Sequence, residues 1–527
     1  MNRRLLLREL TFGGRVAEEE GDRLDAYFVE TDQWHRIVSG KVDVVFGAKG
    51  SGKSAIYTAL LHRTDALFDE GTLLVPAEQP RGTPVFRDLL DEPPPSRLEF
   101  ICLWKLYVLS LVAQALADYG IRNQAARRVL DAVRDARLLS DGRMTLRTRL
   151  RGVRDYVRRL LRPEALETFV ELDPLTSMPA SMGARIALAE PSASQRAAGG
   201  VSVDELLGLA DDALAAEGLS VWVLFDRLDV AFAESRELES QGLRALFQAY
   251  LDLLPHSHIV LKVFLRSDIW RSITRGGFRE ASHITRQMTL RWTDSALLHL
   301  LSRRLLQSAE LAAAYGVDPE IVVASAKAQR RFFDRLVAER VDRSRRLATF
   351  EWILAQVRDG TGQVAPRELI HLLARARELQ LEKLERGENE LSGETLLGAA
   401  ALREAVAEVS AVRLEQTLFA EHPEARGVLQ ALEGEKTTHT LRSLAAIWQT
   451  TDEATALIAA SLVDIGFFER RGTLRSPTYW VPFLYRPALA LVQGSAEHDV
   501  ARPSGTVAVD RGGRPRRPPP ATRARPR

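Results

Sequence analysis

The sequence predicts an α/β protein: a P-loop NTPase-type parallel-sheet core with a long helical insertion, a helical lid and a C-terminal winged-helix-like domain. Three observations lead to this fold class. A glycine-rich loop, Gly47 to Ser54, lies between a short apolar strand and a helix without breakers. A second apolar strand, Ser220 to Phe225, ends directly at Asp226. Helix, helix and hairpin patterns follow one another over residues 441–481, which is the order of a winged helix.

The glycine-rich loop is the most specific motif in the chain. Its residues are Gly47, Ala48, Lys49, Gly50, Ser51, Gly52, Lys53 and Ser54, which fit G-x-x-x-x-G-K-[ST] at every fixed position. Such a loop turns backbone amides toward phosphate oxygens, and the following helix N-terminus adds partial positive charge. Lys53 then suits the β- and γ-phosphates, and Ser54 suits Mg²⁺. The predicted ligands are ATP and Mg²⁺. The alternative is a chance match in a glycine-rich turn.

A carboxylate at the end of a neighbouring strand would complete the metal site. Asp226 follows five apolar residues, where a parallel sheet presents ligand groups, and we expect it to hold Mg²⁺ through water. Many such ATPases carry a second acid directly after this Asp, to polarise the attacking water. Here that position holds Arg227. Asp229 or Glu234 would have to replace the acid, or hydrolysis is slow.

Two arginines are candidate sensors of the nucleotide. Arg266 follows the apolar strand 259–265, and it would contact the γ-phosphate or instead form a structural salt bridge with Asp268. Arg367 follows Pro366, a residue suited to the first turn of a helix. It would reach back to the nucleotide from the lid, or it would cap or pair within the helical domain.

The set Phe46 to Ser54, Asp226 to Asp229, Phe264 to Asp268 and Ala365 to Leu369 resembles a bacterial P-loop ATPase of the AAA+/STAND group. The resemblance covers roughly residues 20–490. It implies phosphate binding by the loop, metal binding by Ser54 and Asp226, and sensor roles for Arg266 and Arg367. The predicted catalytic residues are these two arginines, Asp226, and Asp229 as the substitute acid. Similar proteins are often encoded in conflict and anti-phage loci, so the resemblance implies a role in bacterial defence. A homo-oligomer or a defence-system partner protein would be the protein partners.

An oligomer of this group would place an arginine finger at a neighbouring subunit's nucleotide. Four arginines are candidates for that role: Arg271, Arg275, Arg279 and Arg286. The long insertion between the two nucleotide-binding segments is similar to that of related membrane-associated NTPases. The lack of a clean transmembrane helix argues against membership in that set.

Composition predicts a cytoplasmic protein. The chain has 527 residues, of which 46% are hydrophobic and 27% charged, as in ordinary globular proteins. Its single cysteine, Cys102, leaves no disulfide within the chain, which favours a reducing compartment. The first residues lack an apolar region long enough for a signal peptide.

Two apolar features have alternative interpretations. Residues 101–117 form an apolar helical stretch that contains Lys105, and they are fewer than the ~20 residues that a membrane span needs. We expect a buried helix, with a transmembrane span as the alternative. Phe28 and Trp34 precede the loop, and we expect them in the core, with stacking on the base as the alternative.

Basic residues gather in two places. Residues 121–162 hold thirteen Arg against four Asp, a local charge of +9, and the tail 502–527 carries +7. Since the net charge is +2, everything outside the tail sums to about −5. Arginine forks bind phosphate oxygens two at a time, so DNA or RNA is a possible partner through the Arg-rich insertion, the winged helix and the tail. The alternative is a solvated helical hairpin.

These patterns predict the following domains: a nucleotide-binding core at 1–63 and 201–290, a mostly helical insertion at 64–200, a helical lid at 291–412, a winged helix at 413–494, and a disordered basic Pro/Arg-rich tail at 495–527. Residues 174–200 are read as a linker.

The sequence supports two alternative functions. The first is an ATP-binding and ATP-hydrolysing molecular switch. The second is a nucleic-acid-binding protein that uses ATP as a structural or regulatory ligand with little turnover, and Arg227 keeps that second function open.

Overall fold

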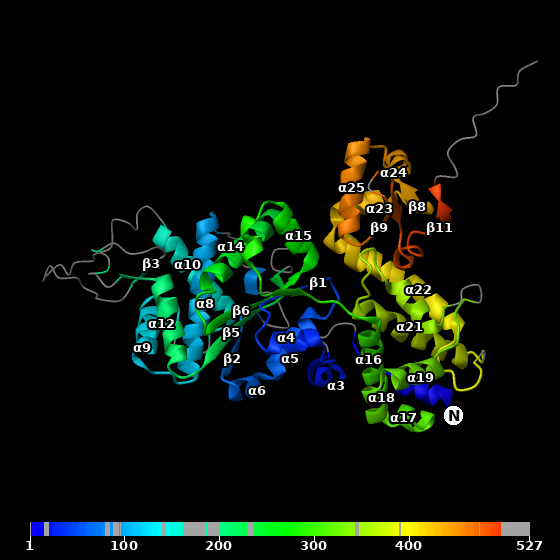
Figure 1. Cartoon of the computed structure of the whole chain (residues 1–527), viewed down its shortest axis with the longest axis horizontal. Helices are drawn as coiled ribbons and strands as arrows, with labels where there is room; N and C mark the ends of the chain where they lie inside the picture. The colour runs from blue at the N-terminus through cyan, green and yellow to red at the C-terminus, as the bar shows by residue number, and fades with distance from the viewer. Residues whose placement is uncertain are drawn as a thin grey trace, which may run out of the picture.

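The structure is a computed structural model in which the core lies at one end of the long axis and the helical lid and the winged helix lie together toward the other end, the winged helix above the lid in the view of Figure 1. It describes residues 2–14, 20–78, 85–87, 94, 96–139, 144–161, 185–187, 193, 196, 200–228, 235–342, 347–388, 391–473 and 475–496. The predicted α/β fold class, with a parallel-sheet core and a winged helix, is confirmed. The predicted disordered tail lies almost wholly outside the described residues.

A five-stranded parallel sheet organises the core. Its strands, in spatial order, are β2 (Thr72–Pro76), β5 (Ser220–Phe225), β6 (Ile259–Arg266), β1 (Val44–Gly47) and β7 (Gln287–Thr289). Phe46 lies opposite Leu265 and Gly47 opposite Arg266, while Phe225 lies opposite Val263. The carboxyl ends of β1, β5 and β6 therefore meet at one edge, which is where open α/β sheets bind ligands.

Alternating residues of the strands face two different helical layers, because successive side chains on a strand point to opposite faces. Val223 and Phe225 face a large apolar cluster, and Trp222 and Leu224 face a smaller one. The large cluster is covered by α8 (Arg97–Asp118), α9 (Gln124–Asp135), α10 (Leu146–Leu161), α12 (Val203–Ala215), α14 (Arg236–Leu253) and α15 (Ser267–Arg275). The smaller one is covered by α4 (Asp32–Val38), α5 (Lys53–His62) and α6 (Thr64–Asp69).

Helix α8 is the apolar segment for which a membrane span was the alternative. Within the described ranges it is the one helix long and apolar enough to cross a membrane, and 78% of its most apolar window is buried. Its single lysine, Lys105, pairs with Asp204 and Asp252, each at 2.8 Å. The expectation of a core helix is confirmed, because α8 packs against α12 and α14 on the sheet (Figure 1).

Two predicted domain boundaries are wrong. Residues 64–200 do not lie wholly outside the core, since β2 pairs with β5 and forms the edge of the sheet. The short strand β1 was predicted because the glycine-rich loop follows it, and no such motif follows β2. Residues 2–14 do not belong to the core, since Leu6 and Leu7 of α1 (Arg3–Glu9) are buried against the lid. Figure 1 shows the N-terminus among the lid helices.

The regular elements of the lid are all helices among its described residues, with two isolated β-bridges between them. It comprises α16 (Asp294–Leu305), α17 (Ala309–Tyr315), α18 (Pro319–Ala324), α19 (Ala326–Leu336), α20 (Thr349–Val357), α21 (Pro366–Glu385) and α22 (Ala399–Val412). Side chains start several of these helices: Thr293 accepts from Ala296 N–H and Asp318 from Glu320 N–H. As predicted, Pro366 opens α21, where its missing N–H costs nothing.

The winged helix shares one apolar core with the lid. It contains α23 (Arg426–Gln430), β8 (Lys436–Thr440), α24 (Leu441–Trp448), α25 (Asp452–Asp464), β9 (Glu469–Gly472), β10 (Pro477–Trp480) and β11 (Val492–Ser495). The predicted helices and hairpin are confirmed, whereas β8 and β11 were not predicted. A π-helix over Arg413–Phe419 continues α22, so the predicted boundary at 413 falls inside a continuous helical segment.

The predicted linker at 174–200 is described only in part. Its described residues include β3 (Arg185–Ala187), which pairs in parallel with β4 (Gly200–Ser202). The predicted Arg-rich hairpin is present as α9 and α10. Arg147 and Arg151 are exposed on α10, while Arg149 is buried and donates to the carbonyl oxygen of Ser110 at 2.9 Å. Arg149 is therefore a structural residue of the hairpin.

Candidate functional site

A cavity of about 270 Å³ lies at the carboxyl edge of the sheet, between core and lid. It brings together segments that are far apart in the sequence. Its lining includes Lys49 to Ser54 of the loop, Asp226 after β5, Arg266 at the end of β6, and Arg367 in the first turn of α21. The structure thus gathers the predicted loop, metal and sensor residues around one space.

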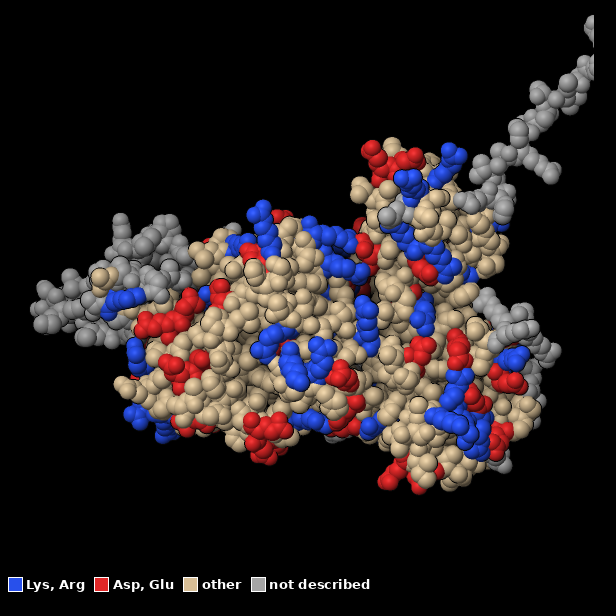
Figure 2. Space-filling view, viewed as in Figure 1, with Lys and Arg blue, Asp and Glu red and all other residues tan. Residues whose placement is uncertain are grey.

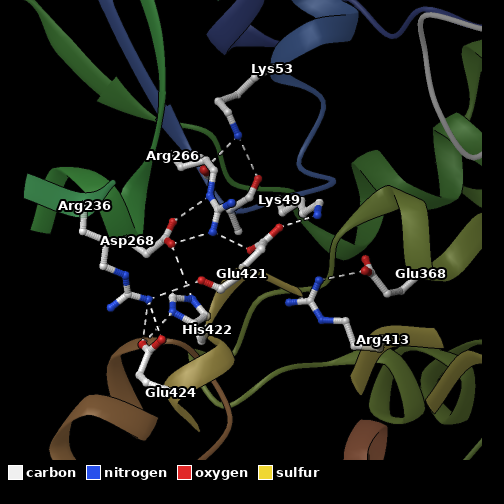
Figure 3. Close-up of polar contacts among 12 residues, drawn as sticks. Lys49, Lys53, Arg236, Arg266, Asp268, Glu368, Arg413, Glu421, His422 and Glu424 are labelled. Carbon is white, nitrogen blue, oxygen red and sulfur yellow. Dashed lines mark hydrogen bonds and ion pairs between the residues drawn. The ribbon is translucent and has the colours of Figure 1, made fainter. Parts of the chain in front are cut away.

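The loop has the backbone shape that a phosphate cradle needs. Gly50 and Gly52 adopt φ values of +79° and +97°, which side chains rarely tolerate. A Cβ on Gly50 would come within 2.9 Å of Arg367 Cβ. The Lys53 ammonium donates to the carbonyl oxygens of Gly47 and Ala48, both at 3.0 Å, which holds it across the loop (Figure 3). These residues fit a nucleotide phosphate chain at the start of α5.

The predicted metal residues also line this cavity. Asp226 is 5% exposed and Ser54 lies in the first turn of α5. A carboxylate and a hydroxyl are hard oxygen ligands of the kind Mg²⁺ prefers, so the donor set fits this ion. Tyr57 lies close to Asp226: burial, and then the charges of Asp226 and Glu78, raise the pKa of its hydroxyl. Tyr57 therefore stays neutral and donates to the carbonyl oxygen of Glu78.

Arg227 is held in a strained backbone conformation. Its φ is +57°, a left-handed value that costs a non-glycine residue about 1 kcal/mol or more. It lines the cavity directly after Asp226, where an acid was expected. The two acids proposed to substitute, Asp229 and Glu234, lie outside the described residues. A fully buried acid that sequence reasoning missed, Glu78, follows the neighbouring strand β2.

The salt bridge predicted for Arg266 is present, and its contact with a γ-phosphate stays a prediction. Its Nε and Nη2 donate to the two carboxylate oxygens of Asp268 at 3.1 and 2.6 Å, so the structural salt bridge exists. Burial works against the charge of Asp268, yet the guanidinium of Arg266 lowers the pKa of that carboxyl overall. Arg266 also lines the cavity and contacts Glu421, an acid that the sequence analysis did not single out.

Arg367 lies over the loop from the lid side. Its neighbour Glu368 is anchored by Arg413 at 2.8 Å in a buried ion pair (Figure 3). The Arg367 guanidinium itself makes no hydrogen bond or ion pair with any residue that the structure describes. The alternative prediction was that Arg367 pairs within the helical domain. Among the described residues, Glu368 forms such a pair, with Arg413, and Arg367 does not.

Aromatic residues also line the cavity. Trp34 is 1% exposed and packs edge-on against Phe28, with ring centroids 4.6 Å apart. Trp34 is a core residue as expected, whereas Phe28 is partly buried and packs against that core. Both line the cavity, so base stacking stays a prediction. Two lining residues were missed: Trp292, whose Nε1 donates to Ser51 O at 2.8 Å, and Arg304, which pairs with Glu20 at 2.7 Å. Neither belongs to a recognisable motif.

The four arginine-finger candidates lie away from this cavity, since none is among the described residues that line it. Arg275 pairs with Asp464, and Arg286 pairs with Asp43 at 2.9 Å. Arg271 donates to the carbonyl oxygen of Ser267 at 3.2 Å. A finger acts on a neighbouring subunit, so the identity of any such residue stays a prediction.

Comparisons with known proteins find no matching family model and no matching curated protein. Among solved structures the chain is similar to the ORC1 protein of Aeropyrum pernix in complex with DNA, at 12% identity and a TM-score of 0.35, covering 90% of this chain and 96% of that one. It is also similar to the ORC2 protein of the same organism (ADPNP-ADP complexes), at 12% identity and a TM-score of 0.34, covering 86% and 89%. At these values the likeness carries no argument about function. By its own sheet topology and loop, the chain is an α/β protein of the P-loop class with a helical lid and a winged helix.

Proposed function

We propose that the chain is an ATP-binding and ATP-hydrolysing molecular switch of the AAA+/STAND type. One observation carries this proposal: the loop, Asp226, Arg266 and Arg367 line a single cavity although they come from four separate segments. A chance match to the loop motif would not gather the other three residues around it. A role in bacterial defence rests on the sequence resemblance alone.

Each residue has a defined task in the proposed reaction. The loop amides and Lys53 bind and orient the phosphate chain, and the Ser54 and Asp226 oxygens hold the metal. Held by Ser54 and Asp226, a bound Mg²⁺ would offset the negative charge of the phosphate chain. Arg266 and Arg367 donate to the terminal phosphate from the core and from the lid. Charged groups act most strongly in such a water-poor cleft, where the dielectric is low.

Measurements of ATP turnover with and without DNA test this function against its alternative. A switch should hydrolyse ATP without DNA, and turnover should require Mg²⁺. The alternative is a nucleic-acid-binding protein that uses ATP as a ligand, and the strained Arg227 in the place of an acid favours it. Tight ATP binding with no turnover under either condition would select the alternative.

A first prediction concerns the lid. Arg367→Ala should reduce the preference for ATP over ADP by about tenfold, because a charge-assisted hydrogen bond contributes ~1.5–3 kcal/mol. ADP affinity should stay nearly unchanged, since a ligand shifts two states only by its differential affinity for them. The measurement is calorimetric titration with a non-hydrolysable ATP analogue and with ADP.

The control for this prediction is Arg403→Ala on α22, which removes an exposed lid arginine. Protease cleavage over residues 290–370 should differ between the ATP and ADP states of the wild-type protein. Equal cleavage of the wild-type protein and Arg367→Ala, each with ATP and with ADP, would contradict a lid switch.

A second prediction concerns polyanions. Figure 2 shows Lys and Arg mixed with Asp and Glu on the viewed face, with no single continuous basic surface. Binding to DNA or RNA would then depend on the local clusters. It should fall steeply with salt, since each neutralised phosphate releases counterions. Replacing exposed Arg147 and Arg151 by Gln should weaken binding and reduce the salt slope by about two.

Deletion of 502–527 should weaken polyanion binding further, because it removes a local charge of +7. Arg149 is left intact in this series because its hydrogen bonds to Ser110 and Gln114 hold α10 against α8. Gel retardation at several salt concentrations provides the readout. No retardation of either nucleic acid at low salt would end this prediction.

A further inference from the structure

An exposed pair of aromatic rings lies on the core, outside the nucleotide cavity. Phe68 of α6 and Tyr119, which caps the C-terminus of α8, are 42% and 43% exposed, although large aromatic side chains are usually buried. Their rings stack, with centroids 5.3 Å apart. Neither residue lines the nucleotide cavity, so the proposed ATP site does not account for the pair. Because the two rings face water together, they form a surface that a partner can cover.

Acidic side chains flank the aromatic pair. Asp65 lies on α6, Glu70 caps the C-terminus of that helix, and Asp118 precedes Tyr119; all three acids are exposed. Asp65 and Glu70 form no ion pair with any residue that the structure describes. Asp118 accepts a hydrogen bond from the amide of Gln114 at 2.7 Å, which leaves its charge in place. The rings are therefore bordered by carboxylates whose charge is not neutralised.

The basic side chains at the end of α5 do not offset this charge. His62 contacts Asp25 at 3.0 Å, and Arg63 pairs with Glu30, so each already has an acidic partner. Figure 2 shows Asp and Glu gathered at the lower edge of the molecule, where Figure 1 places α6. The surface thus combines two aromatic rings with a local excess of negative charge, which favours a basic partner that can stack on the rings.

The C-terminal segment of the chain has the complementary chemistry. Residues 502–527 hold eight Arg, six Pro and one Asp, a local charge of +7. Proline-rich segments dock on aromatic side chains at low entropic cost, because they already favour the extended polyproline conformation. A guanidinium stacks on the face of Phe or Tyr and pairs with a neighbouring carboxylate. A nucleic acid, by contrast, would be repelled by the acids.

We propose that Phe68, Tyr119 and the acids beside them form a docking surface for residues 502–527 of a second copy of this chain. The core, which carries α6, and the winged helix, which contains β11 just before this segment, lie toward opposite ends of the long axis (Figure 1). The segment of a neighbouring copy therefore reaches α6 without crossing its own molecule. Two copies that exchange their segments form a closed dimer. Docking needs no nucleotide and is independent of the proposed ATP-binding function.

Sedimentation of the full-length protein tests the association. The protein should be larger than a monomer at about 50 mM NaCl and monomeric at about 500 mM, because salt screens exposed charges. An excess of synthetic peptide 502–527 should also produce the monomer. The double variant Phe68→Ala, Tyr119→Ala should weaken the association about tenfold, and so should the double variant Asp65→Asn, Glu70→Gln.

The matched control removes the same charge at another place. Asp452 and Glu453 are exposed acids in the first turn of α25, on the winged helix. The double variant Asp452→Asn, Glu453→Gln should associate as the wild-type protein does. Equal weakening by this control would overturn the proposal, because net charge alone would then explain the association.

Disulfide cross-linking tests the position of the segment. Ala66 is exposed on α6, and Ala521 belongs to the segment 502–527. A mixture of the Ala66→Cys and Ala521→Cys proteins should give covalently linked pairs of chains on mild oxidation. The native Cys102 stays in place, since burial raises the pKa of its thiol to about 11 and keeps it unreactive. A control mixture with Leu457→Cys, an exposed position on α25, should give few linked pairs.

The outcomes separate this docking from its alternatives. A protein that is monomeric at low salt at every concentration would overturn the proposal, as would association that persists in both double variants of the docking surface. Equal cross-linking to Leu457→Cys would overturn it, because the segment would then bind without regard to the aromatic pair. Cross-linking confined to single chains that carry both cysteines would assign the segment to its own core and overturn exchange between copies. Each of these results leaves the ATP-binding function standing.

Discussion

Lys53→Ala should weaken ATP binding about 10- to 100-fold, because a charge-assisted hydrogen bond contributes ~1.5–3 kcal/mol. The lysine lies across the phosphate loop, where its ammonium is 3.0 Å from the carbonyl oxygens of Gly47 and Ala48. With nucleotide bound, the ammonium would contact a negatively charged β- or γ-phosphate instead of two neutral carbonyl oxygens. Turnover should fall at least as far as affinity. Calorimetry and phosphate release measure the two effects.

The fold should survive this change. Lys53 opens α5, and the apolar face of that helix is held by Ile56, Tyr57 and Leu60 in the core. Lys41→Ala is the matched control, since it removes an exposed lysine just before β1. Lys53→Arg keeps the charge with a different geometry and should recover only part of the affinity. Unchanged ATP affinity and turnover in Lys53→Ala would refute the phosphate-loop interpretation.

Asp226→Asn should lower Mg²⁺-dependent turnover about 10- to 100-fold, the usual cost of losing an outer-shell partner of a metal. The two side chains have nearly the same shape, so β5 and its packing should be kept. The amide lacks the charge that attracts the ion. ATP affinity measured without metal should therefore change little, while the Mg²⁺ concentration needed for half-maximal turnover should rise.

The control is Asp69→Asn, at an exposed position on α6. Thermal unfolding of both variants should match the wild-type protein without ligand. Addition of Mg²⁺ and a non-hydrolysable ATP analogue should raise the unfolding temperature of Asp69→Asn more than that of Asp226→Asn, by linkage of binding to folding. If Asp226 only ended a strand, the two variants would respond to ligand alike.

Local patterns were enough for the parts of the site that are continuous in sequence. The phosphate loop needs a fixed spacing of glycines, Lys53 and Ser54, so one stretch holds all of its information. Strands β5 and β6 are short apolar runs that end in Asp226 and Arg266, and both were predicted within a residue or two. Edge strand β2 was missed because, unlike the equally short β1, it has no recognisable motif directly after it.

The Glu421 contacts could not be predicted, because they depend on how the domains pack. Glu421 lies 155 residues from Arg266 in sequence, and neither belongs to a pattern that names the other. The same holds for Trp292, which contacts Ser51 across 241 residues. Which residue a side chain contacts at such a separation depends on how many apolar residues pack together. No single motif in the sequence encodes that packing.

The sequence by itself determined that the chain has a phosphate loop, a metal-binding candidate and a C-terminal winged helix. These follow from short-range rules: glycine freedom, strand alternation and helix starts. Only the tertiary structure decided that Arg367 lies over Gly50, that Arg266 is shared between Asp268 and Glu421, and that the N-terminal helix packs on the lid. Burial of apolar surface selects these arrangements, since it depends on total area and not on the order of residues in the chain.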